Sequence, residues 1–148
     1  MTAYQDRPCN GSEAGRGDAG GPHRYRIRAL PDDPRGAQLA RHTTQEALAT
    51  WQLEDLADTA VLLVSELVTN AVVHARADRA PIALILESQR GWLRIEVHDA
   101  DPRRLQPRRP GVLDESGFGL LLVDALASKW GVDETATGKT VWAELETR

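Results

Sequence analysis

Residues 54–75 read EDLADTAVLLVSELVTNAVVHA, and their apolar positions recur every three or four residues. That period is typical of an amphipathic helix with one wide apolar side. The apolar positions are Leu56, Ala60, Leu63, Val64, Leu67, Val68, Ala71 and Val72. We therefore expect a long helix here, with most of its apolar side in the core.

The segment before this helix predicts a strand and a second helix. Tyr25, Ile27 and Ala29 alternate with arginines, which indicates an edge strand with one face in water. Pro31 and Pro34 should end that strand. A helix is then expected over residues 35–50.

The segment after the long helix predicts four strands and one short helix. Alternating apolar residues indicate strands around 82–86 and 93–97, joined by a turn at 89–91. A helix over 118–128 should stop at Lys129-Trp130-Gly131, because a basic residue followed by glycine is a common helix end. Two last strands are expected over 132–135 and 140–146, with Gly138 in the turn between them. The order predicts an α+β fold, a two-layer α/β sandwich with a mixed, mostly antiparallel sheet and helices on one face.

Composition limits the class of protein. The 148 residues suit one domain, expected over 23–148. Residues 1–22 are rich in glycine and poor in large apolar side chains, so we expect a disordered tail, either dispensable or partner-binding. The net charge of −4 gives no sign of direct nucleic-acid binding. A single cysteine, Cys9, and the lack of a secretory signal or a long apolar run favour a cytoplasmic protein without a membrane segment.

The long helix carries the first candidate site. Glu66 and Asn70 are four residues apart, so they lie on one stripe of the helix, and His74 extends it by a turn. The stripe borders the apolar side, where a carboxylate and an amide need partners. Phosphate oxygens and Mg²⁺, which prefers oxygen ligands, could be those partners. A solvated stripe or a pair within the helix would explain the same residues.

Asp99 is the second candidate. It continues the alternation of Leu93, Ile95 and Val97, so its side chain should point toward the core. A carboxylate there needs hydrogen-bond donors, and the exocyclic amine of a purine is one. The alternative is a turn aspartate that caps the start of the following loop.

The third candidate is Gly117-Phe118-Gly119-Leu120, which opens the short helix. It follows residues 100–116, which hold three prolines and four arginines without periodicity. Loops of that length inside a domain are usually functional. Glycines at a helix start allow phosphate to approach unpaired backbone N–H groups. A flexible connection to the helix is the simpler interpretation.

Together, these motifs and Gly138-Lys139-Thr140 before Val141-Trp142-Ala143 resemble the GHKL ATPases, the superfamily of DNA gyrase, ninety-kilodalton chaperones, histidine kinases and mismatch-repair proteins. Within it, the chain looks like the single-domain anti-sigma-factor serine kinases. The resemblance extends from about residue 24 to residue 146 and implies a Bergerat-type ATP-binding fold.

The resemblance also implies roles for individual residues. Glu66 matches the family's general base, Asn70 its Mg²⁺ ligand, and Asp99 the aspartate that binds the adenine amino group. His74 follows near the phosphates, and Thr140 matches a threonine near the adenine. Residues 100–116 match the lid over ATP, and the phosphate-holding segment at its end corresponds to Gly117, Phe118, Gly119 and Leu120.

The implied function is a serine/threonine protein kinase that uses ATP and Mg²⁺ and acts as an anti-sigma factor. Its implied partners are an anti-sigma-factor antagonist protein, a sigma factor and a second copy in a homodimer. The chain departs from the family where two glycines are usual, because Asp101 and Arg103 stand there. That departure favours the alternative, a non-catalytic ATP-gated module that sequesters a partner. A histidine-kinase catalytic domain acting in trans is a third interpretation.

Overall fold

The computed structural model describes residues 22–74, 81–99, 118–135 and 138–147. In these residues five strands form one sheet, in the order β1-β2-β3-β5-β4, and every neighbouring pair is antiparallel. The strands are β1 His23–Leu30, β2 Ile82–Gln89, β3 Trp92–Asp99, β4 Lys129–Thr135 and β5 Gly138–Glu146. The helices are α1 Pro34–Thr50, α2 Ala57–His74 and α4 Phe118–Leu126, with a short 3-10 helix at Glu54–Leu56.

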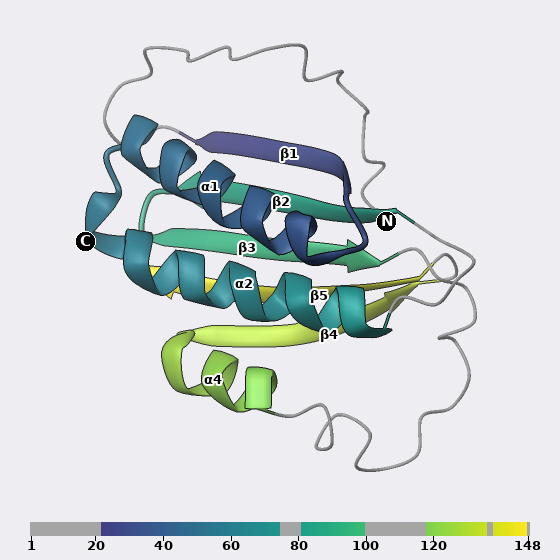
Figure 1. Ribbon diagram of the computed structural model, residues 1–148. Coiled ribbons are helices and arrows are strands. Elements are labelled where there is room, and N and C mark those ends of the chain that lie inside the picture. The colour runs from purple at the N-terminus through teal and green to yellow at the C-terminus, as the bar shows by residue number, and fades with distance from the viewer. Residues whose placement is uncertain (1–21, 75–80, 100–117, 136–137, 148) are drawn as a thin grey trace.

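The helices lie together on one face of the sheet, as Figure 1 shows. The predicted two-layer α+β fold is therefore confirmed, and the sheet is antiparallel throughout its described pairs. The strand predicted around 24–29 is an edge strand, since β1 pairs only with β2. The expected tail, residues 1–22, lies outside the described residues except for Pro22, and the loop 100–116 lies outside them entirely.

The start of α1 is set by local chemistry. Asp33 caps the helix, because its Oδ1 accepts a hydrogen bond from the backbone N–H of Arg35 at 2.9 Å, and Pro34 opens the first turn. The hydrogen bonds from the Arg35 side chain and backbone lower the pKa of Asp33. Pro31 and Pro34 therefore separate strand from helix as predicted, and the helix begins at Pro34.

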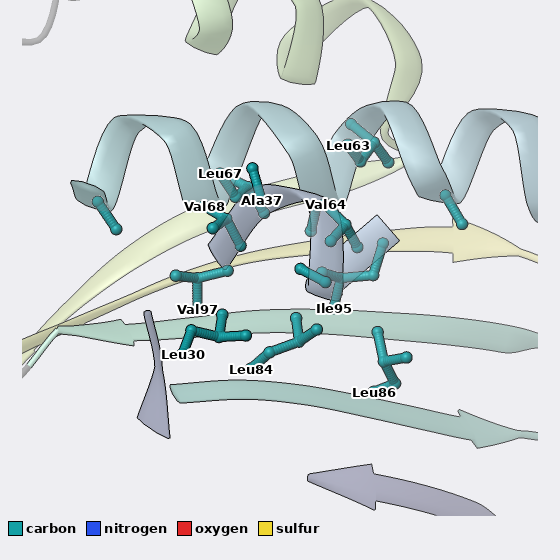
Figure 2. Close-up of a cluster of buried hydrophobic side chains, with 14 of the residues drawn as sticks. Leu30, Ala37, Leu63, Val64, Leu67, Val68, Leu84, Leu86, Ile95 and Val97 are labelled. Atoms are coloured by element: carbon teal, nitrogen blue, oxygen red, sulfur yellow. The ribbon is translucent and has the colours of Figure 1, made fainter. Parts of the chain in front are cut away.

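The core lies between the helices and the inner face of the sheet. Figure 2 shows side chains of α2 above those of β2 and β3. Fully buried members include Leu63, Val64, Val68, Leu84, Leu86, Leu93 and Ile95. The apolar positions of residues 54–75 thus point where the sequence predicted, although residues 54–56 form the 3-10 helix and α2 itself begins at Ala57.

One boundary differs from the sequence prediction. Lys129, Trp130 and Gly131 were expected to end the short helix, but they belong to β4. The helix ends at Leu126 because the backbone N–H of Ser128 already bonds the carbonyl of Glu144 on β5, at 2.8 Å. Gly131 lies opposite Trp142, and a Cβ there would come within 2.8 Å of the indole ring. Its lack of a side chain makes room for Trp142, so it is not a helix cap.

The outer face of the sheet carries a row of alternating charge. Arg24, Glu87, Arg94, Glu144 and Lys129 are successive cross-strand neighbours from β1 to β4. Opposite charges on adjacent strands stabilise a sheet, while like charges there destabilise it. The row therefore favours this strand order.

Arg94 is the centre of that row. Its Nε donates to Glu96 at 2.6 Å and its Nη1 to Glu144 at 2.9 Å, while its guanidinium lies 4.2 Å from the centre of the Trp142 ring. Burial lowers the pKa of Arg94, but the hydrogen bonds to the two glutamates outweigh burial and raise it. Arg94 thus joins two carboxylates and an aromatic ring from two strands.

No helix among the described segments is long and apolar enough to cross a membrane.

Replacing Gly36 in α1 with alanine should destabilise the domain. Alanine normally stabilises a helix by about 1 kcal/mol relative to glycine. Here a Cβ would lie 2.1 Å from the carbonyl oxygen of Pro31, so the first turn of α1 or the preceding loop must move. Chemical denaturation should show a loss of about 1–3 kcal/mol in unfolding free energy. Gln38→Ala, at an exposed site two residues on, is the control and should change little. A more stable Gly36→Ala variant would contradict this packing.

Arg94→Leu should also destabilise the domain, because Glu96 and Glu144 would lose a charged donor while half-buried. The expected loss of unfolding free energy is about 1–3 kcal/mol. Arg94→Lys should recover only part of it, since lysine cannot present two hydrogen bonds in one plane. Equal unfolding midpoints for the parent and the leucine variant would show that the network is unimportant.

Candidate functional site

Helix α2 and strand β3 run in the same direction, and one turn of the helix advances about as far as two residues of the strand. Val64 lies over Ile95 and Val68 over Val97 in Figure 2. One helical turn of four residues advances about 6 Å, and two strand residues advance about 6.6 Å. One further step brings Ala71 and Val72, in the last turns of α2, over Asp99. The C-terminal end of β3 therefore lies beneath the C-terminal end of α2.

Asp99 lies at that end of β3. It is the last residue of β3, its side chain points to the helix side as predicted, and it is 2% exposed. Its cross-strand neighbours are Ile82 on β2 and Lys139 on β5. A carboxylate so deeply buried needs donors, so this position suits recognition of a polar group by an acid.

Glu66 and Asn70 lie on the flank of α2 that faces away from α1. Ser65 marks the α1 flank, because its Oγ accepts a hydrogen bond from Nη1 of Arg41 at 3.1 Å. At 3.6 residues per turn, Glu66 is about 100° and Asn70 about 140° around the helix from Ser65. Helix α4 packs on that other flank of α2 (Figure 1). Both residues are half-buried, as expected for a stripe that borders the core.

The remaining predicted residues are placed only in part. His74 is the last residue of α2, and Phe118, Gly119 and Leu120 form the first turn of α4, but their side chains lie outside the described part. Gly117 lies outside it altogether. In Figure 1, α4 begins toward the end of the molecule where α2 and β3 finish. The start of α4 thus points toward the end of the molecule that holds Asp99.

Thr140 does not share this site. It pairs with His98, and its Oγ1 lies 2.9 Å from the Nδ1 of that histidine on the outer face of the sheet. The expectation that its side chain lies near the adenine is corrected, because successive residues of a strand point to opposite faces. Lys139 faces the Asp99 side instead, and it is 8% exposed. The sequence already indicates this inward orientation, since Lys139 continues the alternation of the inward residues Val141, Ala143 and Leu145.

Among the described residues, no three His, Cys, Asp or Glu side chains group closely enough to hold a metal ion. The oxygen donors on the α4 flank of α2 are the carboxylate of Glu66 and the amide of Asn70. Such a pair suits Mg²⁺, which keeps several waters and shares its remaining positions with substrate phosphates.

The antiparallel sheet, the helical layer and the acid at the end of β3 define a two-layer domain of the GHKL type. Comparison with known proteins gives the family. The model of the histidine kinase-like ATPase domain matches residues 30–145, and the chain belongs to that family.

The chain is also similar to two individual proteins. The uncharacterized protein SCO4941 of Streptomyces coelicolor is 35% identical over 83 residues, which are 55% of this chain and 79% of that protein. The crystal structure of the RsbU and RsbW domains of Rv1364c from Mycobacterium tuberculosis matches 85% of this chain with a TM-score of 0.59 and 23% identity. The chain spans only a third, 33%, of that larger protein, and the likeness concerns the fold.

Membership of an ATPase family implies ATP as the ligand, and the chemistry of the described residues fits it. Asp99 offers a buried acceptor at one end of the site, as recognition of an adenine amine requires. Glu66 and Asn70 offer oxygen ligands on the flank next to α4. The first turn of a helix presents backbone N–H groups without intrahelical partners, which suit phosphate. The buried acid and the pair on the helix flank thus come from different elements, β3 and α2.

Asp99→Asn should weaken ATP binding, because a charged acceptor for the amine is replaced by a neutral one. Hydrogen bonds to charged groups contribute about 1.5–3 kcal/mol, so the dissociation constant should rise roughly 10- to 100-fold. Isothermal titration calorimetry with Mg-ATP measures the change, and circular dichroism checks the fold. Equal affinities in a folded variant would remove Asp99 from the base site.

Proposed function

We propose that this chain is an ATP-dependent serine/threonine protein kinase that acts as an anti-sigma factor and phosphorylates an antagonist protein. The observation that carries the proposal is the half-buried pair of Glu66 and Asn70 on the flank of α2 that faces α4. Family membership supports the use of ATP, and the fold of an RsbW domain supports the kinase type.

In this proposal each residue has one task. Glu66 is the general base that takes the proton from the serine or threonine hydroxyl of the partner protein. Asn70 holds Mg²⁺, which would neutralise negative charge on the phosphate oxygens when bound. Asp99 orients the adenine, and Gly117 and Gly119 let the backbone approach the phosphates. His74 and the first turn of α4 complete the phosphate end.

A small domain can supply this chemistry because phosphoryl transfer needs little from the protein beyond positioning and charge stabilisation. The core packing of α2 on β3 fixes Glu66, Asn70 and Asp99 on two rigid elements. Sites on rigid elements hold their geometry better than sites on loops. The same reason supports assigning the base and the Mg²⁺ ligand to α2.

The proposed partners follow from the kinase type. The antagonist protein would present the hydroxyl to Glu66, a sigma factor would compete with it for the kinase, and the kinase would act as a homodimer. The neighbour of similar fold contains RsbU and RsbW domains in one chain, so a domain of this fold can occur beside another domain.

A second function is favoured by the residues that follow β3. Asp101 and Arg103 stand where the family pattern has glycines that allow the backbone close to the nucleotide. Side chains and an added negative charge there would weaken nucleotide binding. The alternative is therefore a non-catalytic module that holds ATP and sequesters a regulatory partner.

Comparing Glu66→Gln with Asn70→Ala separates the two functions. Loss of a general base lowers the transfer rate by about 10²–10⁴-fold, so Glu66→Gln should keep ATP affinity while phosphate transfer to serine falls by that factor. Asn70→Ala should also weaken binding of Mg-ATP, because a metal ligand is lost. Labelled ATP and purified antagonist proteins measure transfer, and calorimetry measures binding.

The control is Glu54→Gln, an exposed glutamate before α2, which should leave both quantities unchanged. If the parent chain transfers phosphate and Glu66→Gln does so equally fast, Glu66 is not the base. If the parent binds ATP but phosphorylates no antagonist, the binding module is the better description. Acid-labile phosphohistidine on a partner would instead indicate a histidine-kinase activity.

A further inference from the structure

Two buried residues of opposite charge face each other at the end of the sheet. Asp99, at the end of β3, and Lys139, near the start of β5, are direct cross-strand neighbours. Asp99 is 2% exposed and Lys139 is 8% exposed. Aspartate and lysine are rarely buried to this degree unless they are paired.

The register puts both side chains on the helix side of the sheet. Val97 and Val141, then Ile95 and Ala143, are the preceding opposite pairs, and all of them contribute to the core beneath the helices. Opposite residues of antiparallel strands have Cβ atoms about 4.5–5.5 Å apart. A lysine side chain is long enough to bring its ammonium to a carboxylate across that distance.

The composition of the chain makes this lysine unusual. The sequence has sixteen arginines and only two lysines, Lys129 and Lys139. Lys129 is exposed on the outer face, opposite Glu144, whereas Lys139 is buried on the inner face, opposite Asp99. The ammonium of lysine is a compact charge, while the planar guanidinium of arginine needs more room and more acceptors.

We propose that Lys139 is a positioning residue of the nucleotide site, which orients the carboxylate of Asp99 toward the base. Burying a lone carboxylate is costly, and a cation on the neighbouring strand offsets that cost. Lys139 thereby fixes the acceptor that the amine of the base meets. The inference rests on the proposed role of Asp99 in binding the base of ATP.

Glu134 gives the lysine a second acidic neighbour. It faces Lys139 from β4 and is exposed, so the inner row reads Ile82, Asp99, Lys139 and Glu134 across four strands. Lys139 therefore lies between a buried acid and an exposed acid. The buried one gains more from the pairing, since water screens the charge of the exposed one.

The first experiment is a double-mutant cycle on stability, which needs no nucleotide. Lys139→Met replaces the cation opposite the buried Asp99 with an apolar side chain, so the melting temperature should fall by about 5–10 °C. Asp99→Asn replaces the carboxylate opposite the lysine with a neutral amide. In that background, Lys139→Met should lower the melting temperature much less. Lys129→Met, the control at an exposed position, should change the melting temperature little. Additive effects of the two substitutions would overturn the pairing.

The second experiment tests the link to the base. Binding of ATP is compared with binding of purine riboside triphosphate, which lacks the 6-amino group. Lys139→Met should weaken ATP binding about tenfold and leave the analogue nearly unaffected, because the lost orientation concerns only the amine. Lys139→Arg keeps the charge and should recover part of the ATP affinity. Equal losses for both nucleotides would assign Lys139 a merely structural role.

The two experiments also separate this inference from the proposed function. A parent chain that binds no ATP would refute the nucleotide site and, with it, the role of Lys139 toward the base. Coupling between Lys139 and Asp99 in the stability cycle would still stand in that case as a structural pair. Absence of coupling in a chain that does bind ATP would leave the proposed function intact and refute this inference alone.

Discussion

The packing of α2 along β3 is the contact on which the rest of the structure depends. A turn of the helix and two residues of the strand advance by nearly the same distance, so Val64 and Val68 each meet a partner on β3 (Figure 2). The same apolar side of α2 that closes the core fixes the rotation of the helix. That rotation carries Glu66 and Asn70 to the flank next to α4, and the common direction carries the end of α2 over Asp99. The packing that builds the core therefore also places the residues of the candidate site.

The two faces of the sheet differ in where they carry apolar and charged residues. The inner face is apolar along most of its length and becomes charged only at the row of Asp99 and Lys139, where the helical cover ends. The outer face has no helical layer among the described residues, and one cross-strand row on it alternates basic and acidic residues from β1 to β4. Arg94 joins Glu96 and Glu144 there and lies over Trp142. The charged row on the outer face stabilises the sheet, whereas the charged residues at the end of the inner face belong to the candidate site.

The site combines groups from elements that are distant in sequence. The residues proposed for catalysis come from α2, the proposed acceptor for the base comes from β3, and the lysine that faces it comes from β5. Such a site tolerates change in the segment after β3 better than a site built on one loop, because the fixed groups belong to the core elements. In the proposed site, the departures at Asp101 and Arg103 would therefore change the strength of nucleotide binding without moving Glu66, Asn70 or Asp99.

The sequence by itself determined the element types, the helical layer and the inward register of Asp99. Local periodicity is enough to predict these features, because apolar residues with a period of 3.6 or 2 indicate which side of a helix or strand is buried. Only the tertiary structure decided which residue of the neighbouring strand lies opposite Asp99. Thr140 and Lys139 are adjacent in sequence, yet the pairing of β5 with β3 puts Thr140 beside His98 and Lys139 beside Asp99. A shift of one residue in that register would have exchanged them, and a motif read as a string does not specify it. The end of α4 was likewise settled by the hydrogen bond of Ser128 to Glu144, which lies sixteen residues further along the chain.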